Sequence, residues 1–320
     1  MSVPLDIFRA LADPTRLRII ALLRKMELSV GELAQVLGQS QPRVSRHVKI
    51  LCDAGLAVRR KEGSWAFLGT GAPSRVDPLF RAIDHWQAEE GENHWVVADT
   101  ARIAAVHADR AQAAERYFAA RAAQWDAIRS LHVAESEVEA AMARALAERP
   151  IGRLADIGTG TGRMIELFGR EAQSAVGIDR SPEMLRLART KLSNAGFDGW
   201  ELRQGDLSAL PLPDGAADTV ILHQVLHFIP APEAAIVELA RVTSPEGRVL
   251  IVDFAPHDRE ELRNEDAHAR LGFSDEQITG WFAAAGLECD LSENLEGGEL
   301  TVKLWRGRRR AEPQLKVIAA

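Results

Sequence analysis

The residues best suited to chemistry lie in LADIGTGTGRM, residues 154–164, where a short apolar run ends in an acidic residue and a glycine-rich turn. Glycine tolerates positive φ, and without a Cβ it lets backbone N–H groups approach a ligand closely. The motif Gly158-x-Gly160-x-Gly162 differs from the dinucleotide fingerprint, whose third glycine falls one position later. Asp156 beside this turn would repel a pyrophosphate and attract an ammonium group. These residues predict a site for a nucleoside that carries an amino-acid group.

Two more carboxylates follow later apolar runs. Asp179 ends the run in AVGIDRSPEML, where a carboxylate can accept hydrogen bonds from both ribose hydroxyls. Asp206, in QGDLSALPLPDGAADTVILHQVLHF, can accept a hydrogen bond from an adenine amino group. Together these residues favour an S-adenosyl ligand over a dinucleotide. The alternative is that the aspartates only cap helices or form turns, and it applies most to Asp206.

The elements that must position these residues can be predicted from the apolar pattern. Five β-rich runs are separated by helical stretches, namely RLADI, SAVGID, WELRQGD, ADTVILH and GRVLIVDF. Strands alternating with helices indicate an α/β fold with a doubly wound, Rossmann-like sheet, which binds ligands at the carboxyl ends of its strands.

The first 70 residues have a different, helical pattern. Asp13 begins one helix, and Ser29 begins a second with a capping box. Gly38 ends that second helix, Ser40 begins a third, and Gly55 ends it. Two short helices joined by a glycine-containing turn predict a helix-turn-helix.

The third helix and the hairpin after it carry the residue types that bind DNA. LAVRRKEGSWAFL alternates and turns at residues 62–64, which predicts a two-stranded wing. Residues 1–73 hold 11 Lys and Arg against 6 Asp and Glu, whereas the remaining residues hold 28 against 40. The alternative is a small helical domain with a charged surface. The predicted DNA-binding residues are Ser40, Gln41, Arg43, Ser45, Arg46, His47, Lys49, Arg59, Arg60 and Lys61.

FRALADPTRLRIIALL and VGELAQVLGQSQPRVSRHVKILCDAGLAVRRKEG resemble the winged-helix ArsR-type bacterial repressors over roughly the first 70 residues. The resemblance implies a homodimer that binds a pseudo-palindromic double-stranded DNA operator. ELAQVL lacks the cysteine pair of the metal-sensing members, and Asp84, His85 and His94 do not reproduce the spacing of their carboxylate/histidine site. No metal site is therefore predicted, and these three residues are expected on the surface or at the dimer seam.

The alanine-rich segment that follows predicts one or two long helices. The ArsR resemblance implies that residues 74–95 form a dimerisation helix. Tyr117, Phe118 and Trp125 are expected to dock the later part onto the next domain. The alternative makes that part a lid over the ligand pocket.

Residues 115–290 resemble the class I S-adenosylmethionine-dependent methyltransferases through LADIGTGTG, VGIDRSPEML, GDLSALPLPDGAADTV and ILHQVLHF. The resemblance implies S-adenosylmethionine or S-adenosylhomocysteine as cofactor, and it assigns the methionine moiety, ribose, adenine and sulfur end, in that order, along the chain. The implied cofactor-binding residues are Asp156, Gly158, Thr159, Gly160, Gly162, Asp179, Arg180, Asp206, Leu207 and His223.

The acceptor side is less defined by the sequence. His223, His227 and Asp253 could line a substrate pocket, but no nucleophile or base is signalled. His257, Asp258 and His268 are expected on a solvated, charged helix, because their spacing gives no closed ligand set. The catalytic residues stay unknown.

Chain length and composition complete the domain prediction. Four parts are expected: a winged helix-turn-helix at 1–73, a helical connector at 74–114, a methyltransferase-like domain at 115–305 and a basic tail at 306–320. Cys52 and Cys289 lie in different parts, which favours a reducing, cytoplasmic setting without disulfides. The apolar runs are too short to cross a membrane.

The resemblances lead to one function and two alternatives. The first hypothesis is a dimeric transcriptional regulator, expected to act as a repressor, whose methyltransferase-like domain binds S-adenosylhomocysteine or S-adenosylmethionine as effector. Similar fusions control genes of the methionine and S-adenosylmethionine cycle, and accumulation of the homocysteine form would require recycling genes. The second is an active methyltransferase with an unknown, small-molecule or larger, methyl acceptor and an autoregulatory DNA-binding head. The third is a body that only supports the dimer.

Overall fold

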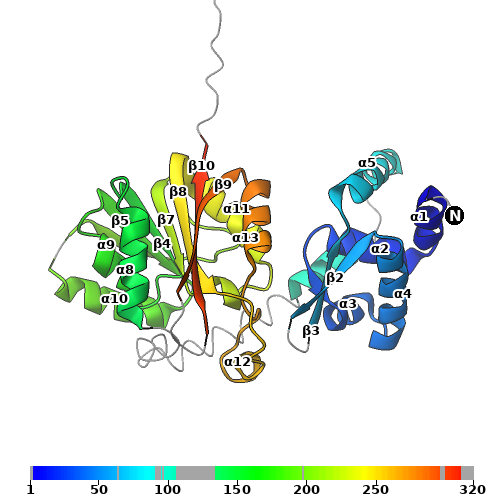
Figure 1. The fold of residues 1–320 in the computed structure, drawn as a ribbon, viewed down its shortest axis with the longest axis horizontal. Helices are drawn as coiled ribbons and strands as arrows, with labels where there is room; N and C mark the ends of the chain where they lie inside the picture. The colour runs from blue at the N-terminus through cyan, green and yellow to red at the C-terminus, as the bar shows by residue number, and fades with distance from the viewer. Residues whose placement is uncertain are drawn as a thin grey trace, which may run out of the picture. The chain divides into compact units, whose positions relative to one another are not determined.

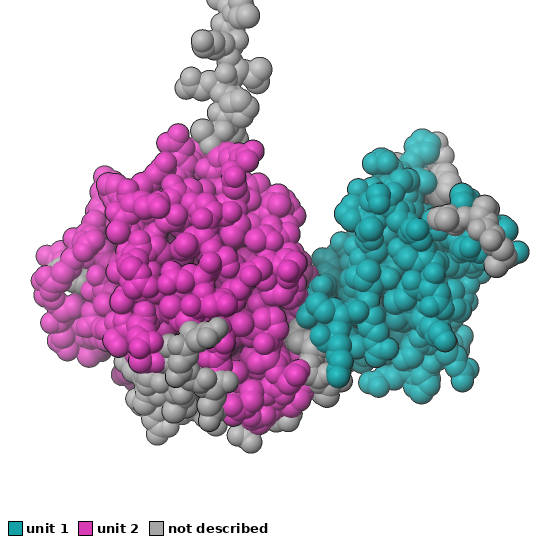
Figure 2. Space-filling model, viewed as in Figure 1, with its two compact units in different colours: residues 1–112 teal, residues 113–320 magenta. Residues whose placement is uncertain are grey.

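A computed structural model of the chain describes residues 3–62, 65–90, 95, 97–105, 134–196, 198–295 and 300–310. The chain divides into two compact units, residues 1–112 and 113–320 (Figure 2). Among the described residues, no helix combines the length and the apolar character that crossing a membrane requires.

The first unit is a winged helix-turn-helix. Its small sheet has the order β1-β3-β2, and both strand pairs are antiparallel. The predicted turn at Gly63 and Ser64 lies outside the described residues. The elements are α1 (Val3–Leu11), α2 (Pro14–Leu23), β1 (Leu28–Ser29), α3 (Val30–Leu37), α4 (Gln41–Asp53), β2 (Ala57–Glu62), β3 (Trp65–Thr70) and α5 (Pro73–Glu90), and residues 97–105 are also helical.

Local capping explains where these helices begin and end. The Asp13 carboxylate accepts hydrogen bonds from the N–H groups of Thr15 at 2.8 Å and Arg16 at 3.2 Å. Ser29 forms the predicted capping box at the start of α3, which ends at Gly38 with φ of 64°. Ser40 occupies the N-cap position of α4, but its side chain makes no capping hydrogen bond.

The helix of residues 97–105 is attached to the helix-turn-helix. Arg18 of α2 donates two hydrogen bonds of 2.7 Å to the carboxylate of Asp99, which is 1% exposed. Lys25 donates to Thr100 at 2.7 Å, and Ile103 lies in the hydrophobic core of the unit. The segment that leads away from the DNA-binding elements is therefore fixed to them. Tyr117, Phe118 and Trp125 lie outside the described residues.

The second unit is a three-layered α/β domain (Figure 1). Its sheet has the order β6-β5-β4-β7-β8-β10-β9. The first five strands in this order are parallel to one another, and β10 is antiparallel to its neighbours β8 and β9. The strands are β4 (Arg153–Ile157), β5 (Ser174–Asp179), β6 (Trp200–Gln204), β7 (Ala217–His223), β8 (Thr243–Phe254), β9 (Leu287–Leu295) and β10 (Val302–Arg309).

Helices cover both faces of this sheet. One face packs against α8, α9 and α10, and the other against α11 and α13. Two short helices, η2 and α12, follow the carboxyl ends of β7 and β8. The helices are α8 (Glu135–Leu146), α9 (Arg163–Phe168), α10 (Pro182–Asn194), η2 (Leu226–Phe228), α11 (Pro232–Val242), α12 (Glu261–Glu265) and α13 (Asp275–Ala284). The predicted doubly wound sheet beside a winged helix-turn-helix is thus confirmed.

The end of the sheet requires a correction. The strand pair β9 and β10 was not predicted, and residues 306–309, assigned by sequence to a basic tail, continue β10. The side chain of Arg306 is buried because it donates to both carboxylate oxygens of Asp290, at 2.8 and 3.0 Å, and to the Ala145 carbonyl. The sequence suggested a tail because residues 306–310 are rich in arginine. The partners that bury Arg306 lie 16 and 161 residues away along the chain, so the local sequence did not reveal them.

Candidate functional site

The candidate ligand site lies where the strand order of the sheet reverses, between β4 and β7. Gly158, Gly160 and Gly162 follow β4 and all have positive φ, at 69°, 52° and 84°. A Cβ at Gly158 would meet the Val225 side chain, just beyond β7, at 2.4 Å. This loop therefore requires glycine both for its backbone conformation and for its contact with the segment after β7. Open α/β sheets bind ligands in the crevice at this reversal point.

Asp156, the last acidic residue before the loop, is 1% exposed. Its carboxylate accepts a hydrogen bond from the Thr159 hydroxyl at 2.5 Å. The Asp156 carboxylate is therefore bound to the glycine loop through Thr159. Its negative charge there would favour a cationic group of a ligand over an anionic one.

Asp179, at the carboxyl end of β5, is tied to the same loop. One carboxylate oxygen accepts the Gly160 N–H at 2.8 Å, and the other accepts the Ser181 N–H at 2.8 Å. Burial raises the pKa of Asp179, and the backbone N–H groups of Ser181, Gly160 and Arg180 only partly oppose that effect. Because an ionised carboxylate can accept about four hydrogen bonds, Asp179 keeps acceptor capacity for a ribose hydroxyl.

Asp206 and the loop after β6 show a more local role. The Asp206 carboxylate accepts from the Ser208 N–H at 2.8 Å and from its hydroxyl at 2.6 Å, which is the turn-forming alternative stated above. Arg180 lies 3.5 Å from the second carboxylate oxygen of Asp206, and both side chains are exposed. Leu207, the other predicted adenine contact, is 9% exposed.

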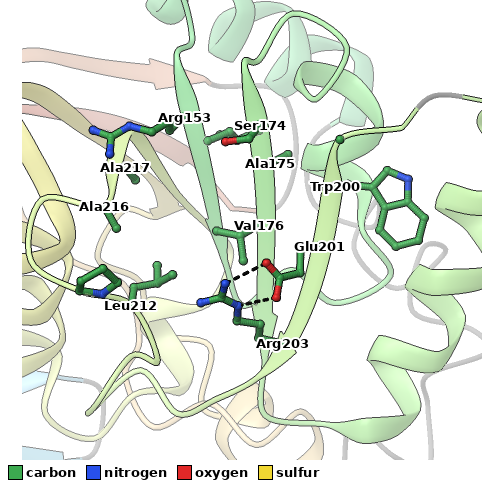
Figure 3. A pocket seen from close by; sticks show the side chains of 13 residues that line it. Arg153, Ser174, Ala175, Val176, Trp200, Glu201, Arg203, Leu212, Ala216 and Ala217 are labelled. Carbon is green, nitrogen blue, oxygen red and sulfur yellow. Dashed lines mark hydrogen bonds and ion pairs between the residues drawn. The ribbon is translucent and has the colours of Figure 1, made fainter.

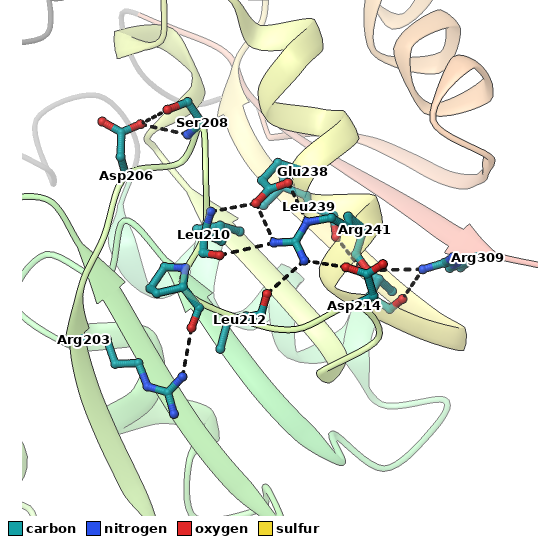
Figure 4. Close-up of polar contacts among 12 residues, drawn as sticks. Arg203, Asp206, Ser208, Leu210, Leu212, Asp214, Glu238, Leu239, Arg241 and Arg309 are labelled. Carbon is teal, nitrogen blue, oxygen red and sulfur yellow. Dashed lines mark hydrogen bonds and ion pairs between the residues drawn. The ribbon is translucent and has the colours of Figure 1, made fainter.

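One arginine of α11 holds the loop that carries Asp206 (Figure 4). Across residues 205–216, all described, no helix forms between β6 and β7. Instead Arg241 donates to the carbonyls of Leu210 at 3.2 Å and Leu212 at 2.9 Å, and Glu238 accepts the Leu210 N–H at 2.7 Å. The Glu238 carboxylate also binds the Arg241 guanidinium, which raises the pKa of Arg241. Nothing in the sequence indicated this pair, because its partners are backbone groups 28 or more residues away.

A cavity of about 340 Å³ lies elsewhere in this unit, near the amino ends of β4, β5 and β6 (Figure 3). Arg153, Trp200 and Leu212 are among its lining residues, and Glu201 and Arg203 pair with each other inside the lining. None of the predicted cofactor-binding residues lines it. The cavity therefore carries none of the chemistry assigned to the glycine loop.

The segment after β7 contains a buried polar pair. His223, the predicted residue at the sulfur end, is 8% exposed. Four residues later, His227 Nδ1 lies 2.8 Å from Asp253 Oδ1 at the end of β8. The sequence placed both residues near a substrate pocket but did not pair them, because their pairing depends on the register of β7 with β8.

Eight of the ten predicted DNA-binding residues are exposed, and two are partly buried. Ser40, Gln41, Arg43, Ser45, Arg46 and Lys49 are exposed along α4, and Arg59 and Lys61 are exposed on β2. His47 instead lies 3.8 Å from Asp13, with its side chain 14% exposed. Arg60 donates to Glu27 at 2.9 Å and lies over the Phe67 ring. The structure thus turns these two members of the predicted set inward, since both side chains find partners on other segments.

Two of the three connector residues expected on the surface or at the dimer seam are exposed in the structure. Asp84 of α5 is exposed and accepts two hydrogen bonds from Arg24, at 2.5 and 2.8 Å. His85 is exposed, and His94 lies outside the described residues.

Comparison with known proteins separates the two units. Residues 13–58 match the family model "Bacterial regulatory protein, arsR family", and residues 155–251 match the model "Methyltransferase domain". The chain is 37% identical over 107 residues to the arsenical resistance operon repressor of Escherichia coli, covering 31% of this chain and 86% of that protein. It is 36% identical over 139 residues to a phosphatidylethanolamine N-methyltransferase of Cereibacter sphaeroides, covering 43% of this chain and 66% of that enzyme, slightly less than two thirds of its length.

A solved structure supports the fold of the second unit. A chain of the complex between the Trm112 methyltransferase activator of Haloferax volcanii and its candidate methyltransferase aligns with a TM-score of 0.51 and 20% identity, covering 60% of this chain and 97% of that one. At that identity the likeness concerns the fold alone.

Proposed function

Because this chain belongs to the ArsR family of bacterial regulatory proteins and carries a class I methyltransferase domain after its DNA-binding head, we propose that the methyltransferase domain senses an adenosyl ligand for the head. In this proposal the protein is a transcriptional regulator, S-adenosylhomocysteine or S-adenosylmethionine is its effector, and its target genes belong to the methionine and S-adenosylmethionine cycle. The choice of target genes follows the resemblance to fusions of the same two parts.

The observation that carries the proposal is the contact between the glycine loop and Asp179. The Gly158 and Thr159 N–H groups donate to the Ile178 carbonyl, so the positive-φ loop is fixed against the end of β5. Asp179, which accepts the Gly160 N–H there, keeps acceptor capacity for a ribose hydroxyl. Asp156 beneath the loop favours the ammonium of an amino-acid moiety. The residues present therefore fit an adenosyl amino acid, whether that ligand is a reactant or a signal.

A homodimer is part of the proposal. The side chains of Leu5 and Phe8 on α1 are 42% and 66% exposed, and Leu17 on α2 is 36% exposed. Leu5 and Phe8 are three residues apart and so share one face of α1, and exposed apolar side chains on one helix face favour association with a second copy. Two copies of α4 would then contact the two halves of a pseudo-palindromic operator.

The ligand would act by favouring one dimer geometry. Allosteric coupling between two sites is typically worth about 1–3 kcal/mol, which changes DNA affinity by about 5- to 150-fold. The helix of residues 97–105, held by Arg18 and Asp99, gives the DNA-binding elements a fixed attachment to the chain that leads toward the second unit. A ligand that binds both geometries equally would leave DNA affinity unchanged.

The test uses an operator selected from a random DNA library by the full-length protein. We expect S-adenosylhomocysteine or S-adenosylmethionine to change the Kd for that DNA, measured by fluorescence anisotropy, by about fivefold or more. Asp179→Ala should keep DNA binding and lose the ligand response. Calorimetric binding of both ligands with no change in DNA affinity would exclude the sensor function.

Methyl transfer is the second candidate function, and one observation favours it. A sensor needs only the glycine loop and Asp179, whereas the structure also has the buried His227–Asp253 pair at the same edge of the sheet. Transfer of a labelled methyl group from S-adenosylmethionine into a host extract, lost in Asp179→Ala, would test this candidate.

A further inference from the structure

The His227–Asp253 pair is fixed from several directions. The Asp253 side chain is fully buried and its carboxylate accepts the His227 ring Nδ1–H at 2.8 Å, the His227 backbone N–H at 3.2 Å and the Phe254 N–H at 2.8 Å. The His227 carbonyl in turn accepts the N–H groups of Ala269 and Arg270, both at 2.9 Å. Asp253, near the end of β8, therefore holds both the ring and the backbone N–H of His227. Residues 269 and 270 hold its carbonyl.

Aromatic packing fixes the plane of the His227 ring. The ring centroids of Phe228, His268 and Phe254 lie 3.9, 4.2 and 5.0 Å from that of His227. His268 is itself titratable, and the described titratable groups nearby also include His257, whose ring packs against Phe254, and Arg270, whose backbone N–H donates to the His227 carbonyl. His223, at the end of β7, is buried. A ring held by packing and by a carboxylate on one nitrogen is a typical arrangement of a positioned base.

The pair lies at the carboxyl ends of β7 and β8, at the same edge of the sheet as the glycine loop. Val225, two residues before His227, is the side chain that excludes a Cβ from Gly158. Three described non-glycine residues have positive φ, and two of them lie near the pair. Gln224, at 52°, is three residues before His227, and Ala267, at 57°, directly precedes His268. Backbone strain of this kind persists where the surroundings enforce it, and it gathers at functional sites.

We infer that His227 is the proton acceptor for a hydroxyl-bearing methyl acceptor and that Asp253 is its positioning residue. This inference goes beyond a sensor function and rests on the proposed adenosyl ligand. Asp253 on Nδ1 stabilises the tautomer in which Nδ1 carries the proton, so Nε2 keeps its lone pair.

The chemistry favours a hydroxyl over an amine. In transfer from S-adenosylmethionine, an acceptor oxygen forms a bond to the methyl carbon while the sulfur–methyl bond breaks, and its electrons return to sulfur as a neutral thioether. The acceptor proton passes to His227 Nε2, so the positive charge of the sulfonium ends on the imidazolium. A neutral amine already presents a free electron pair, whereas a hydroxyl gains most from a base.

The first test measures the His227 ring directly in the full-length protein labelled with ¹⁵N-histidine, with His227→Gln as the assignment control. Long-range ¹H–¹⁵N spectra should show the tautomer with the proton on Nδ1 and none on Nε2. Asp253→Asn should populate the other tautomer. A proton on Nε2 with Nδ1 bare in the unsubstituted protein, or no change of tautomer in Asp253→Asn, would overturn the inference.

The second test measures whether a small molecule reaches Nε2. Diethyl pyrocarbonate should modify His227, with the exposed His85 as internal control, and S-adenosylhomocysteine at ten times its Kd should slow modification of His227 by about tenfold. Modification of His85 alone would mean that no acceptor can reach the ring, and equal rates with bound ligand would place His227 away from the ligand. Calorimetry on the same protein separates these results from a failure of adenosyl binding.

Discussion

Replacing Arg18 by methionine should strongly destabilise the DNA-binding unit. The substitution removes two hydrogen bonds of 2.7 Å and leaves the Asp99 side chain, 2% exposed, with Arg102 at 3.3 Å as its remaining described cation. Removing one partner of a buried ion pair costs about 3–5 kcal/mol, and the partial exposure of Arg18 and the contact with Arg102 favour the lower end, about 3 kcal/mol. Calorimetry should show the melting transition of this unit lowered by about 15 °C.

Arg24→Met provides the matched control, because Arg24 is the C-cap residue of the same helix and also donates two hydrogen bonds to one carboxylate, that of Asp84. The side chains of Arg24 and Asp84 are both exposed, so water replaces the lost partner and the loss of stability should be small. Adding Asp99→Leu to Arg18→Met should recover part of the stability, because an apolar replacement leaves no buried charge. Equal effects of Arg18→Met and Arg24→Met would refute the argument from burial.

Three further predictions concern the ligand and DNA sites. Burial raises the pKa of Asp179, and ribose hydroxyls donate to its ionised form, so affinity for S-adenosylhomocysteine measured by calorimetry should fall with decreasing pH at a higher pH than for an exposed aspartate; a flat profile between pH 4 and 7 would contradict this. Gly158→Ala should destabilise the protein to urea by about 2 kcal/mol more than Gly196→Ala, because both glycines have φ of 69° but only Gly158 lacks space for a Cβ; equal losses would disprove the steric reason. Arg46→Ala should weaken operator binding by about fivefold to tenfold and reduce its salt dependence, whereas Arg60→Ala should have little effect on DNA affinity because Arg60 is engaged with Glu27; the reverse order would reject the assignment of the DNA-binding face.

Local signals in the sequence were sufficient for much of the fold. The caps at Asp13 and Ser29 and the αL residue Gly38 depend on neighbours within a few residues, and the structure has them as predicted. The predicted runs RLADI, SAVGID and ADTVILH coincide with β4, β5 and β7, because each is a short apolar stretch bounded by turn residues.

Features that depend on distant partners were not predictable. β9 alternates half-buried and exposed residues and β10 is rich in arginine, so neither has the apolar character of the parallel strands. The inward positions of His47 and Arg60 depend on Asp13 and Glu27, which lie 34 and 33 residues away. The ligand and DNA assignments of individual residues remain predictions that the proposed experiments test.

The position of β10 has a consequence for incomplete synthesis. Among the described residues β10 is the last strand, yet it lies between β8 and β9 in the sheet. A ribosome that stops before residue 302 would release a chain with every described element of its first unit and a sheet that lacks an internal member. We expect such a fragment to occupy operators without answering to metabolite levels, so that one nonsense mutation could silence regulation even in a cell that also makes the full-length protein.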